Sequence, residues 1–122
     1  MKLKHLDEDN NRRKQIAKMY YEGIKNSKIR MPSVKGDESN VFHIFPVFTE
    51  KRDELQASLK DHDIGTLIHY PIPPHKQNCY KEWNGMSFPV TEKIHAQELS
   101  LPMSPCLTDE QVQYVIEIIN QF

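Results

Sequence analysis

Three prolines within four residues, Pro71, Pro73 and Pro74, constrain the fold of this chain more than any other feature. They lie in the stretch GTLIHYPIPPHKQNCY, residues 65–80, just after an apolar run that predicts a strand over residues 66–70. Proline fixes φ and removes a backbone donor, so the chain beyond that strand can form neither helix interior nor central strand. A stiff loop with imidazole, phenol and amide groups at a strand end is a common way to direct side chains at a ligand.

His69, Tyr70 and His75 are the candidate binding residues of this stretch. On a strand, His69 and Tyr70 are expected to point to opposite faces, so that one faces a pocket while the other packs. The alternative interpretation makes Tyr70 a core residue and His69 a surface histidine. A zinc site formed by the two histidines and Cys79 is a weaker alternative, because their spacing matches no common structural zinc pattern. We therefore predict no metal site.

The composition excludes several classes of function. Sixteen basic and seventeen acidic residues among 122 leave a formal charge of −1, which argues against a nucleic-acid partner. No apolar run is long enough to cross a bilayer, and no signal-peptide hydrophobic region follows the first residues, so we expect no membrane contact and a cytoplasmic location. The two cysteines, Cys79 and Cys106, form no CxxC pair, which suits a reducing compartment.

The first half of the chain alternates helix and strand signals. Spacing of apolar residues predicts a helix over residues 6–26, and residues 27–40 have the composition of a connecting loop. VFHIFPVF, residues 41–48, predicts a strand in which the proline requires an edge or a bulge. Thr49 is the expected N-cap of a helix that ends near residue 61.

The second half predicts a helical turn at residues 76–81 and a helix to about residue 98 with Thr91 as its N-cap. Residues 99–101 are a candidate third strand, and residues 108–122 form the clearest helix, opened by a Thr-x-x-Gln capping box. The sum is one α/β domain (α+β-like) with a two- to three-stranded small sheet and helices packed mainly on one face.

Two observations suggest that further polypeptide precedes this chain. The first helix begins almost at Met1, with no strand or loop before it. Its apolar stripe is expected to leave an exposed patch around Ile16, Tyr20 and Ile24, where it would pack on a missing domain.

The chain resembles the carboxy-terminal part of the DegT/DnrJ/StrS family of pyridoxal-phosphate-dependent sugar aminotransferases. The resemblance rests on HYPIPPH, FPVTEK and LSLPMSP in this order, and LDEDNNRRKQIAKMYYEGIKN resembles the family's long helix before its small domain. The HYPIPPH form is most similar to enzymes that act on dTDP-linked 3-keto-6-deoxyhexoses. The resemblance thus implies a single C-terminal small domain, with a leading helix at residues 1–26 and an α/β body at residues 27–122.

The resemblance also implies a function. Full-length relatives transfer an amino group, typically from glutamate, to a ketosugar nucleotide, and they are homodimers of the aspartate-aminotransferase-like fold. It implies that His69 and Tyr70, and less directly His75, bind the nucleotide sugar by orientation and hydrogen bonding.

The resemblance does not extend to the reactive machinery. The family's Schiff-base lysine, the acid at the pyridine nitrogen and the phosphate-binding groups lie upstream of the first helix. Lys2, Lys4 and Lys14 have no matching context. Because pyridoxal phosphate needs that lysine and that acid, we expect the chain alone to bind no cofactor and to be inactive. The alternative is a stand-alone, non-enzymatic module that binds a sugar nucleotide or a partner protein.

Overall fold

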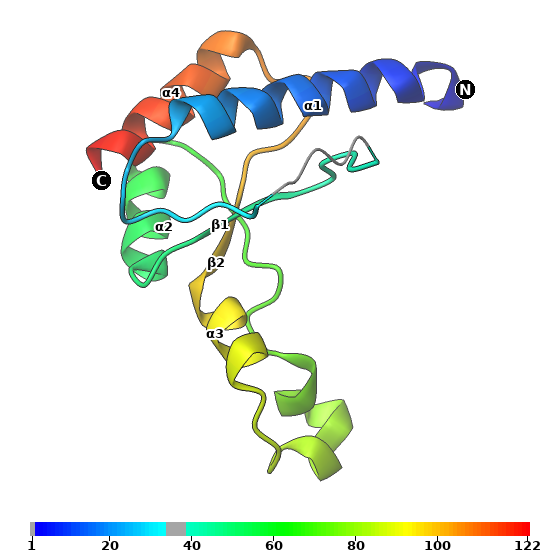
Figure 1. The fold of residues 1–122 in the computed structure, drawn as a ribbon, viewed down its shortest axis with the longest axis vertical. Helices are drawn as coiled ribbons and strands as arrows, with labels where there is room; N and C mark the ends of the chain where they lie inside the picture. Colours follow the sequence, from blue (N-terminus) through cyan, green and yellow to red (C-terminus); the bar gives the residue numbers. More distant parts are fainter. Residues whose placement is uncertain (1, 34–38) are drawn as a thin grey trace.

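The computed structural model describes residues 2–33 and 39–122; part of the predicted connector, residues 34–38, lies outside them. The elements follow in the order η1 (Lys2–His5), α1 (Leu6–Gly23), β1 (Phe45–Phe48), α2 (Arg52–Asp61), η2 (Pro74–Lys76), η3 (Asn78–Trp83), α3 (Pro89–Gln97), β2 (Glu98–Leu101) and α4 (Asp109–Gln121). A short sheet lies at the centre, with α1 and α4 side by side above it and α3 below it (Figure 1).

The sheet has two antiparallel strands, with Phe45 opposite Leu101 and Phe48 opposite Glu98. Both are edge strands of this sheet, which is the setting that Pro46 requires because it has no N–H to donate. Single antiparallel bridges extend the sheet on both sides, from Arg30 to Phe48 and from Leu67 to Ser100. The α/β class and the small sheet predicted from the sequence are confirmed.

Two strand predictions were too long. The strand predicted over residues 41–48 begins only at Phe45, because Phe42 has a positive φ of 50° and its N–H bonds to the Asn40 side chain at 2.8 Å. The strand predicted over residues 66–70 is reduced to the bridge at Leu67, beside β2. At His69 the backbone N–H donates to a side chain instead of a strand, so the ladder ends there.

The apolar stripe of α1 is buried, which contradicts the predicted exposed patch. Ile16 and Tyr20 are fully buried and Ile24 nearly so. The Tyr20 ring packs against Phe45 with 4.9 Å between centroids, its hydroxyl donates to the Pro102 carbonyl at 2.8 Å, and burial raises its pKa. The stripe faces α4 and the sheet of the same chain, so it needs no further domain to cover it.

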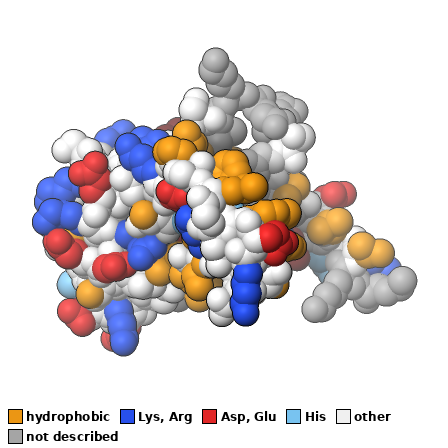
Figure 2. All heavy atoms as spheres, turned by 90° about the horizontal axis from the view of Figure 1, so that it is seen from below, with side chains coloured by type: hydrophobic (Ala, Val, Ile, Leu, Met, Phe, Trp, Pro, Cys, Tyr) orange, Lys and Arg blue, Asp and Glu red, His pale blue; other side chains and the backbone are white. Residues whose placement is uncertain are grey.

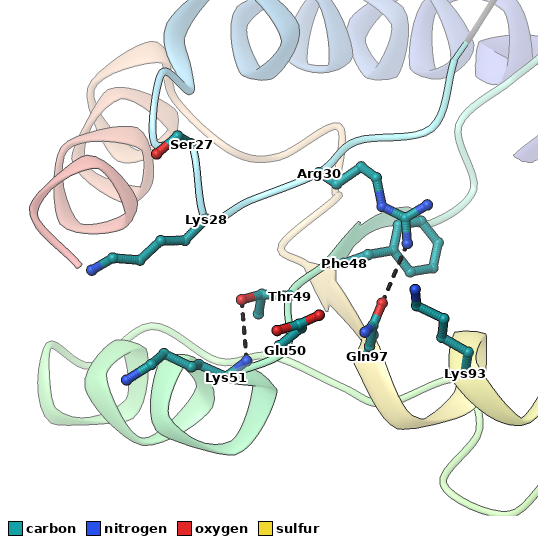
Figure 3. Close-up of a pocket in the computed structure, with 9 residues that line it drawn as sticks. All are labelled: Ser27, Lys28, Arg30, Phe48, Thr49, Glu50, Lys51, Lys93 and Gln97. Carbon is teal, nitrogen blue, oxygen red and sulfur yellow. Dashed lines mark hydrogen bonds between the residues drawn. The ribbon is translucent and has the colours of Figure 1, made fainter.

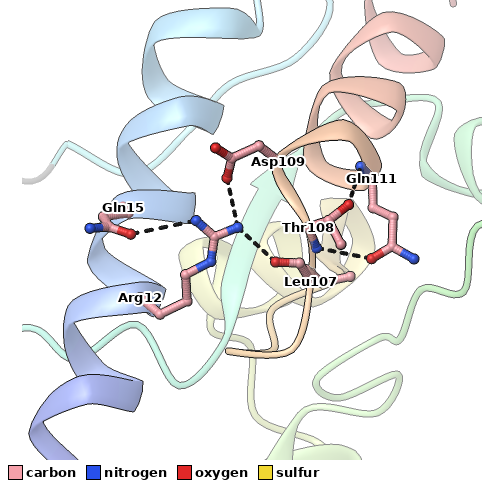
Figure 4. A network of polar contacts seen from close by, with 6 residues as sticks. All are labelled: Arg12, Gln15, Leu107, Thr108, Asp109 and Gln111. Atoms are coloured by element: carbon pink, nitrogen blue, oxygen red, sulfur yellow. Dashed lines mark hydrogen bonds and ion pairs between the residues drawn. The ribbon is translucent and has the colours of Figure 1, made fainter.

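A polar junction joins the first half of α1 to the start of α4 (Figure 4). The Arg12 guanidinium pairs with Asp109 at 2.7 Å and donates to the Leu107 carbonyl at 2.6 Å. The predicted capping box is confirmed: the Thr108 hydroxyl accepts from the Gln111 N–H, and the Gln111 side chain accepts from the Thr108 N–H. The junction therefore sets the position of α4 against α1.

Other helix ends differ from the sequence prediction by two or three residues. α1 ends at Gly23 instead of residue 26. α2 is preceded by Lys51, and Thr49 lies two residues further back with its hydroxyl accepting from the Lys51 N–H. α3 begins at Pro89, so Thr91 is inside the helix and not its N-cap. Proline is favoured at the first helical position because that N–H has no helical partner.

Residues 71–97 form an arm that extends away from the sheet and includes η2, η3 and α3 (Figure 1). Figure 2 looks at this end of the molecule and shows hydrophobic side chains gathered across the middle of that face. The large hydrophobic residues exposed on this arm are Ile72, Tyr80, Trp83, Met86, Phe88, Val90 and Ile94. None of the helices within the described residues is long and apolar enough to span a membrane.

Candidate functional site

A cavity of about 270 Å³ lies where the chain that follows α2 runs past β2. Its walls come from residues 43–44, 65–67, 69 and 100–103, so it joins the start of the proline-rich stretch to the end of the strand. His69 is the only candidate binding residue from the sequence that lines it. The cavity is therefore the candidate binding site.

His69 is held by two buried polar residues of β2. Its backbone N–H donates to Glu98 Oε2 at 2.7 Å, and its ring Nδ1 lies 2.9 Å from Ser100 Oγ. The Ser100 hydroxyl in turn donates to Glu98 Oε1 at 2.5 Å. Glu98 and Ser100 are each only 4% exposed, so this Glu98–Ser100–His69 array fixes both the backbone and the ring of the histidine.

Tyr70 lies at the rim of the site and is 65% exposed. Its ring meets the His69 ring edge-on, with centroids 5.5 Å apart, so the two side chains do not point to opposite faces as predicted. The prediction was wrong because it assumed a regular strand at this point. The Tyr70 carbonyl accepts from His95 Nδ1 of α3, which connects the site to the arm.

His75 has different surroundings from His69, because it is buried inside the arm. Its Nε2 donates to Glu92 Oε1 of α3 at 2.8 Å, and its ring meets Phe88 edge-on at 4.9 Å between centroids. The same carboxylate oxygen accepts the Phe88 N–H at 3.1 Å. The hydrogen bonds from His75 and Phe88 hold the pKa of Glu92 below its ordinary value. His75 thus fastens the proline-rich loop to α3, and a substrate contact by it stays a prediction.

Sequence reasoning missed Glu98, Ser100 and Glu92. Ser100 lay on the strand predicted over residues 99–101, between the apolar Leu99 and Leu101, whereas Glu98 was placed at the end of the helix before it. In the structure Glu98 and Ser100 contact His69. This contact depends on the path of the loop that carries His69, which the sequence does not show.

A second and larger hollow, about 660 Å³, is lined by the connector after α1, by the residues from the end of β1 to the start of α2, and by α3 (Figure 3). It carries several cations, but three of them already have acceptors within the chain. Lys28 donates to the Phe122 carbonyl at 2.6 Å and Lys51 to Glu54 at 2.9 Å. Arg30 stacks on Phe48 and donates to Gln97 at 3.3 Å. This hollow is therefore a weaker candidate than the cavity beside His69.

The described residues do not fit a pyridoxal phosphate site. A Schiff-base lysine reacts from a desolvated position, whereas none of the lysines whose side chains the structure describes is buried. The described residues also contain no group of three or more histidine, cysteine or acidic side chains placed to hold a metal ion.

Three comparisons with known proteins bear on the family and the fold of the chain. The chain is 48% identical over its whole length to a dTDP-3-amino-3,6-dideoxy-alpha-D-galactopyranose transaminase of Aneurinibacillus thermoaerophilus, of which it covers 34%. It superimposes with a TM-score of 0.91 on DesV of S. venezuelae, solved with a ketimine intermediate, at 38% identity, covering 98% of this chain and 33% of that one. NtdA of Bacillus subtilis, solved with the cofactor PMP, gives 0.78 at 25% identity, covering 93% of this chain and 29% of that one.

The chain thus spans about a third of the length of the relatives it matches. The sequence model of one family matches residues 1–120, which is nearly the whole chain. The chain belongs to the DegT/DnrJ/EryC1/StrS aminotransferase family.

Proposed function

We propose that these residues form the substrate-binding part of a pyridoxal-phosphate-dependent aminotransferase that acts on a nucleotide-linked keto-deoxysugar, with dTDP as the nucleotide. The cofactor, the Schiff-base lysine and glutamate as amino donor belong to polypeptide outside this chain. Within the chain no residue is catalytic. The rest of the protein, and a second copy of it in a homodimer, are the proposed partners, and the location is cytoplasmic.

The orientation of His69 supports this proposal most strongly. A buried carboxylate holds its backbone N–H, a buried hydroxyl holds its ring Nδ1, and the ring lines a cavity. Such preorganisation is typical of a recognition group, because the ligand then does not have to order the side chain. The Aneurinibacillus relative is named for a dTDP-linked aminosugar, and its aligned part spans the whole length of this chain.

Each candidate residue has its own role in the proposal. His69 binds the nucleotide sugar by a hydrogen bond, and Tyr70 offers an exposed ring and hydroxyl beside the His69 ring. His75 supports them indirectly, because its bond to Glu92 fastens the loop that follows Tyr70 to α3. A direct sugar contact from His75 would require the arm to open around it.

Calorimetric titration of the chain with a dTDP-linked deoxysugar tests the binding role. Loss of a hydrogen bond to a bound ligand costs about 0.5–1.5 kcal/mol, so His69→Ala and Tyr70→Ala should each raise Kd about 2- to 13-fold. Tyr114→Ala is the matched control, because Tyr114 is exposed on α4 and lines a different hollow. Equal affinities for all variants would contradict the proposal.

A spectrum of the chain mixed with pyridoxal phosphate tests the proposed lack of activity. We expect no stable aldimine band that depends on one particular lysine, because no described lysine is buried. A band abolished by one single lysine substitution, with amino transfer from glutamate, would show that the chain carries the reaction itself.

A second candidate function is a stand-alone module that binds a sugar nucleotide without chemistry. The closed core favours it, since Ile16 and Tyr20 are covered by elements of the same chain. Affinity separates the two candidates. A module should bind the nucleotide sugar as tightly alone as in any longer protein, whereas a part of an enzyme site should bind it far more weakly alone.

A further inference from the structure

We propose that Glu98, in its ionised form, fixes His69 as the Nδ1–H tautomer through the hydroxyl of Ser100, so that Nε2 is a hydrogen-bond acceptor facing the cavity. Glu98 and Ser100 are then positioning residues that decide which ligand group His69 can recognise. The assignment of the tautomer follows from the array together with an ionised Glu98; its consequence for the ligand rests on the proposed function.

The first step is the carboxylate, which accepts at both of its oxygens. Oε2 receives the His69 backbone N–H and Oε1 receives the Ser100 hydroxyl. An ionised carboxylate can only accept hydrogen bonds, and two donors at 2.7 and 2.5 Å suit it. The O···O separation lies in the range of about 2.5–2.7 Å that hydroxyl–carboxylate bonds adopt.

The second step is the single hydrogen atom of the Ser100 hydroxyl. Because the hydroxyl donates that hydrogen to Glu98, Ser100 Oγ has only lone pairs left for His69. Nδ1 lies 2.9 Å from this oxygen, so Nδ1 must carry the proton of the bond between them.

The third step is the other ring nitrogen. In a neutral imidazole only one nitrogen is protonated, so Nε2 is left as an acceptor. Among the described residues no hydrogen-bond partner of His69 Nε2 is found, and the ring lines the cavity. The group that binds there must therefore donate a hydrogen bond.

The opposite arrangement of the protons requires that Glu98 is protonated. If Glu98 were protonated, its Oε1 would donate to Ser100, the hydroxyl would donate to Nδ1, and the ring would carry its proton on Nε2. The two orders leave the heavy atoms in place and differ only in the direction of two hydrogen bonds. The tautomer of His69 therefore reports the ionisation of Glu98.

The consequence for the ligand is a choice of chemical group. A neutral ring with an Nε2 lone pair binds a sugar hydroxyl, and it repels an oxygen of the esterified diphosphate, which has no hydrogen to donate at neutral pH. We therefore assign the His69 side of the cavity to the sugar of the nucleotide sugar and not to its diphosphate.

Long-range 1H–15N correlation spectra of the histidine rings in the ligand-free chain test the tautomer. In the pH range where the ring is neutral, we expect the His69 spectrum to show a protonated Nδ1 and an unprotonated Nε2. A spectrum with the proton on Nε2, or with equal amounts of both tautomers, would overturn the inference. The wild-type spectrum decides this without any variant.

Glu98→Gln tests the relay itself. The amide oxygen can accept the His69 N–H only if the amide NH2 faces Ser100, which turns the hydroxyl toward Nδ1. The tautomer should then switch to Nε2–H, while Glu82→Gln, an exposed substitution on the arm, should leave it unchanged. A folded Glu98→Gln variant that keeps Nδ1–H would contradict the relay.

Titration of the chain with ligands separates this inference from the proposed function. If the wild-type tautomer is Nδ1–H and a dTDP-linked deoxysugar shifts the Nε2 resonance while dimethyl phosphate, a phosphodiester with no P–OH group, does not, both stand. If the tautomer is Nδ1–H and the sugar nucleotide leaves Nε2 unchanged, the proposed function fails and the tautomer assignment stands.

Discussion

Two histidines six residues apart in one loop have different tasks. His69 is held at one ring nitrogen and lines a cavity, whereas His75 is buried and bonded to Glu92. The difference comes from the neighbours in space, since both residues precede or follow prolines in the same stiff segment. The surroundings of each ring, and not its residue type, therefore decide which of the two can bind a ligand.

Glu92 is expected to make the attachment of the arm dependent on pH. Its pKa is lowered in the folded state, so its stabilising contribution is present above the ordinary carboxylate value of 4.5 and is lost as pH falls through the lower folded value. Amide exchange at Phe88, whose N–H donates to Glu92, should therefore be slow at neutral pH relative to the Glu92→Gln variant. Below pH 4.5 the difference should shrink.

Glu82→Gln is the control for this prediction, because Glu82 is exposed on the same arm. It should leave the exchange at Phe88 unchanged at every pH. Equal exchange rates at neutral pH in the Glu92→Gln variant and the wild type would show that the carboxylate does not hold the arm.

The candidate residues could be found from the sequence, but their arrangement could not. The prolines and the adjoining His69 and Tyr70 mark the stretch as special in one dimension. Glu98 and Ser100, which orient His69, are about thirty residues away and come near it through a single bridge at Leu67. No local pattern encodes a contact of that separation.

Among the elements, helices followed the sequence better than strands did. The period of apolar residues and the capping box placed α1 and α4 well, because both signals are local. The predicted strand over residues 66–70 depended on propensity alone. The strand pairing ends at His69, because the backbone N–H of His69 donates to the buried carboxylate of Glu98 and not to a neighbouring strand.

Gly23 allows the close approach of α1 and α4. A Cβ built at this position would lie 2.8 and 2.9 Å from two side-chain atoms of Ile116, whose β-branched side chain has little freedom to move. Gly23→Ala should therefore destabilise the fold by about 1–3 kcal/mol in chemical denaturation, in spite of the better helix propensity of alanine.

Gly85→Ala is the matched control for the Gly23→Ala prediction, since a Cβ at Gly85 meets no atom within 4 Å. Its unfolding free energy should stay near that of the wild type. An equal or greater stability of Gly23→Ala would show that the two helices are not packed as closely as described.

Thr108 is expected to contribute measurably as the N-cap of α4. Replacement of a capping threonine by alanine costs about 1 kcal/mol, so Thr108→Ala should lower the unfolding free energy by about that amount. Thr91→Ala tests the same substitution inside α3, where the structure shows no cap, and it should have the smaller effect. A larger loss for Thr91→Ala would reverse the assignment of the two caps.

At the scale of the whole molecule, a closed core carries an exposed arm. The core joins α1, α2, α4 and the sheet, and it leaves no apolar stripe of α1 uncovered. The arm keeps large hydrophobic side chains such as Trp83 and Val90 at the surface. Since the chain spans a third of its relatives, we propose that the rest of the protein completes the cavity beside His69.

The most direct test of the account is a map of backbone and histidine-ring resonances of the chain during titration with a dTDP-linked deoxysugar. We predict shifts at the residues around the cavity, led by His69 and Tyr70, and no shift at the hollow beside Lys51. Shifts confined to the Lys51 hollow, or a saturated complex in which the His69 ring is unperturbed, would contradict the central claim.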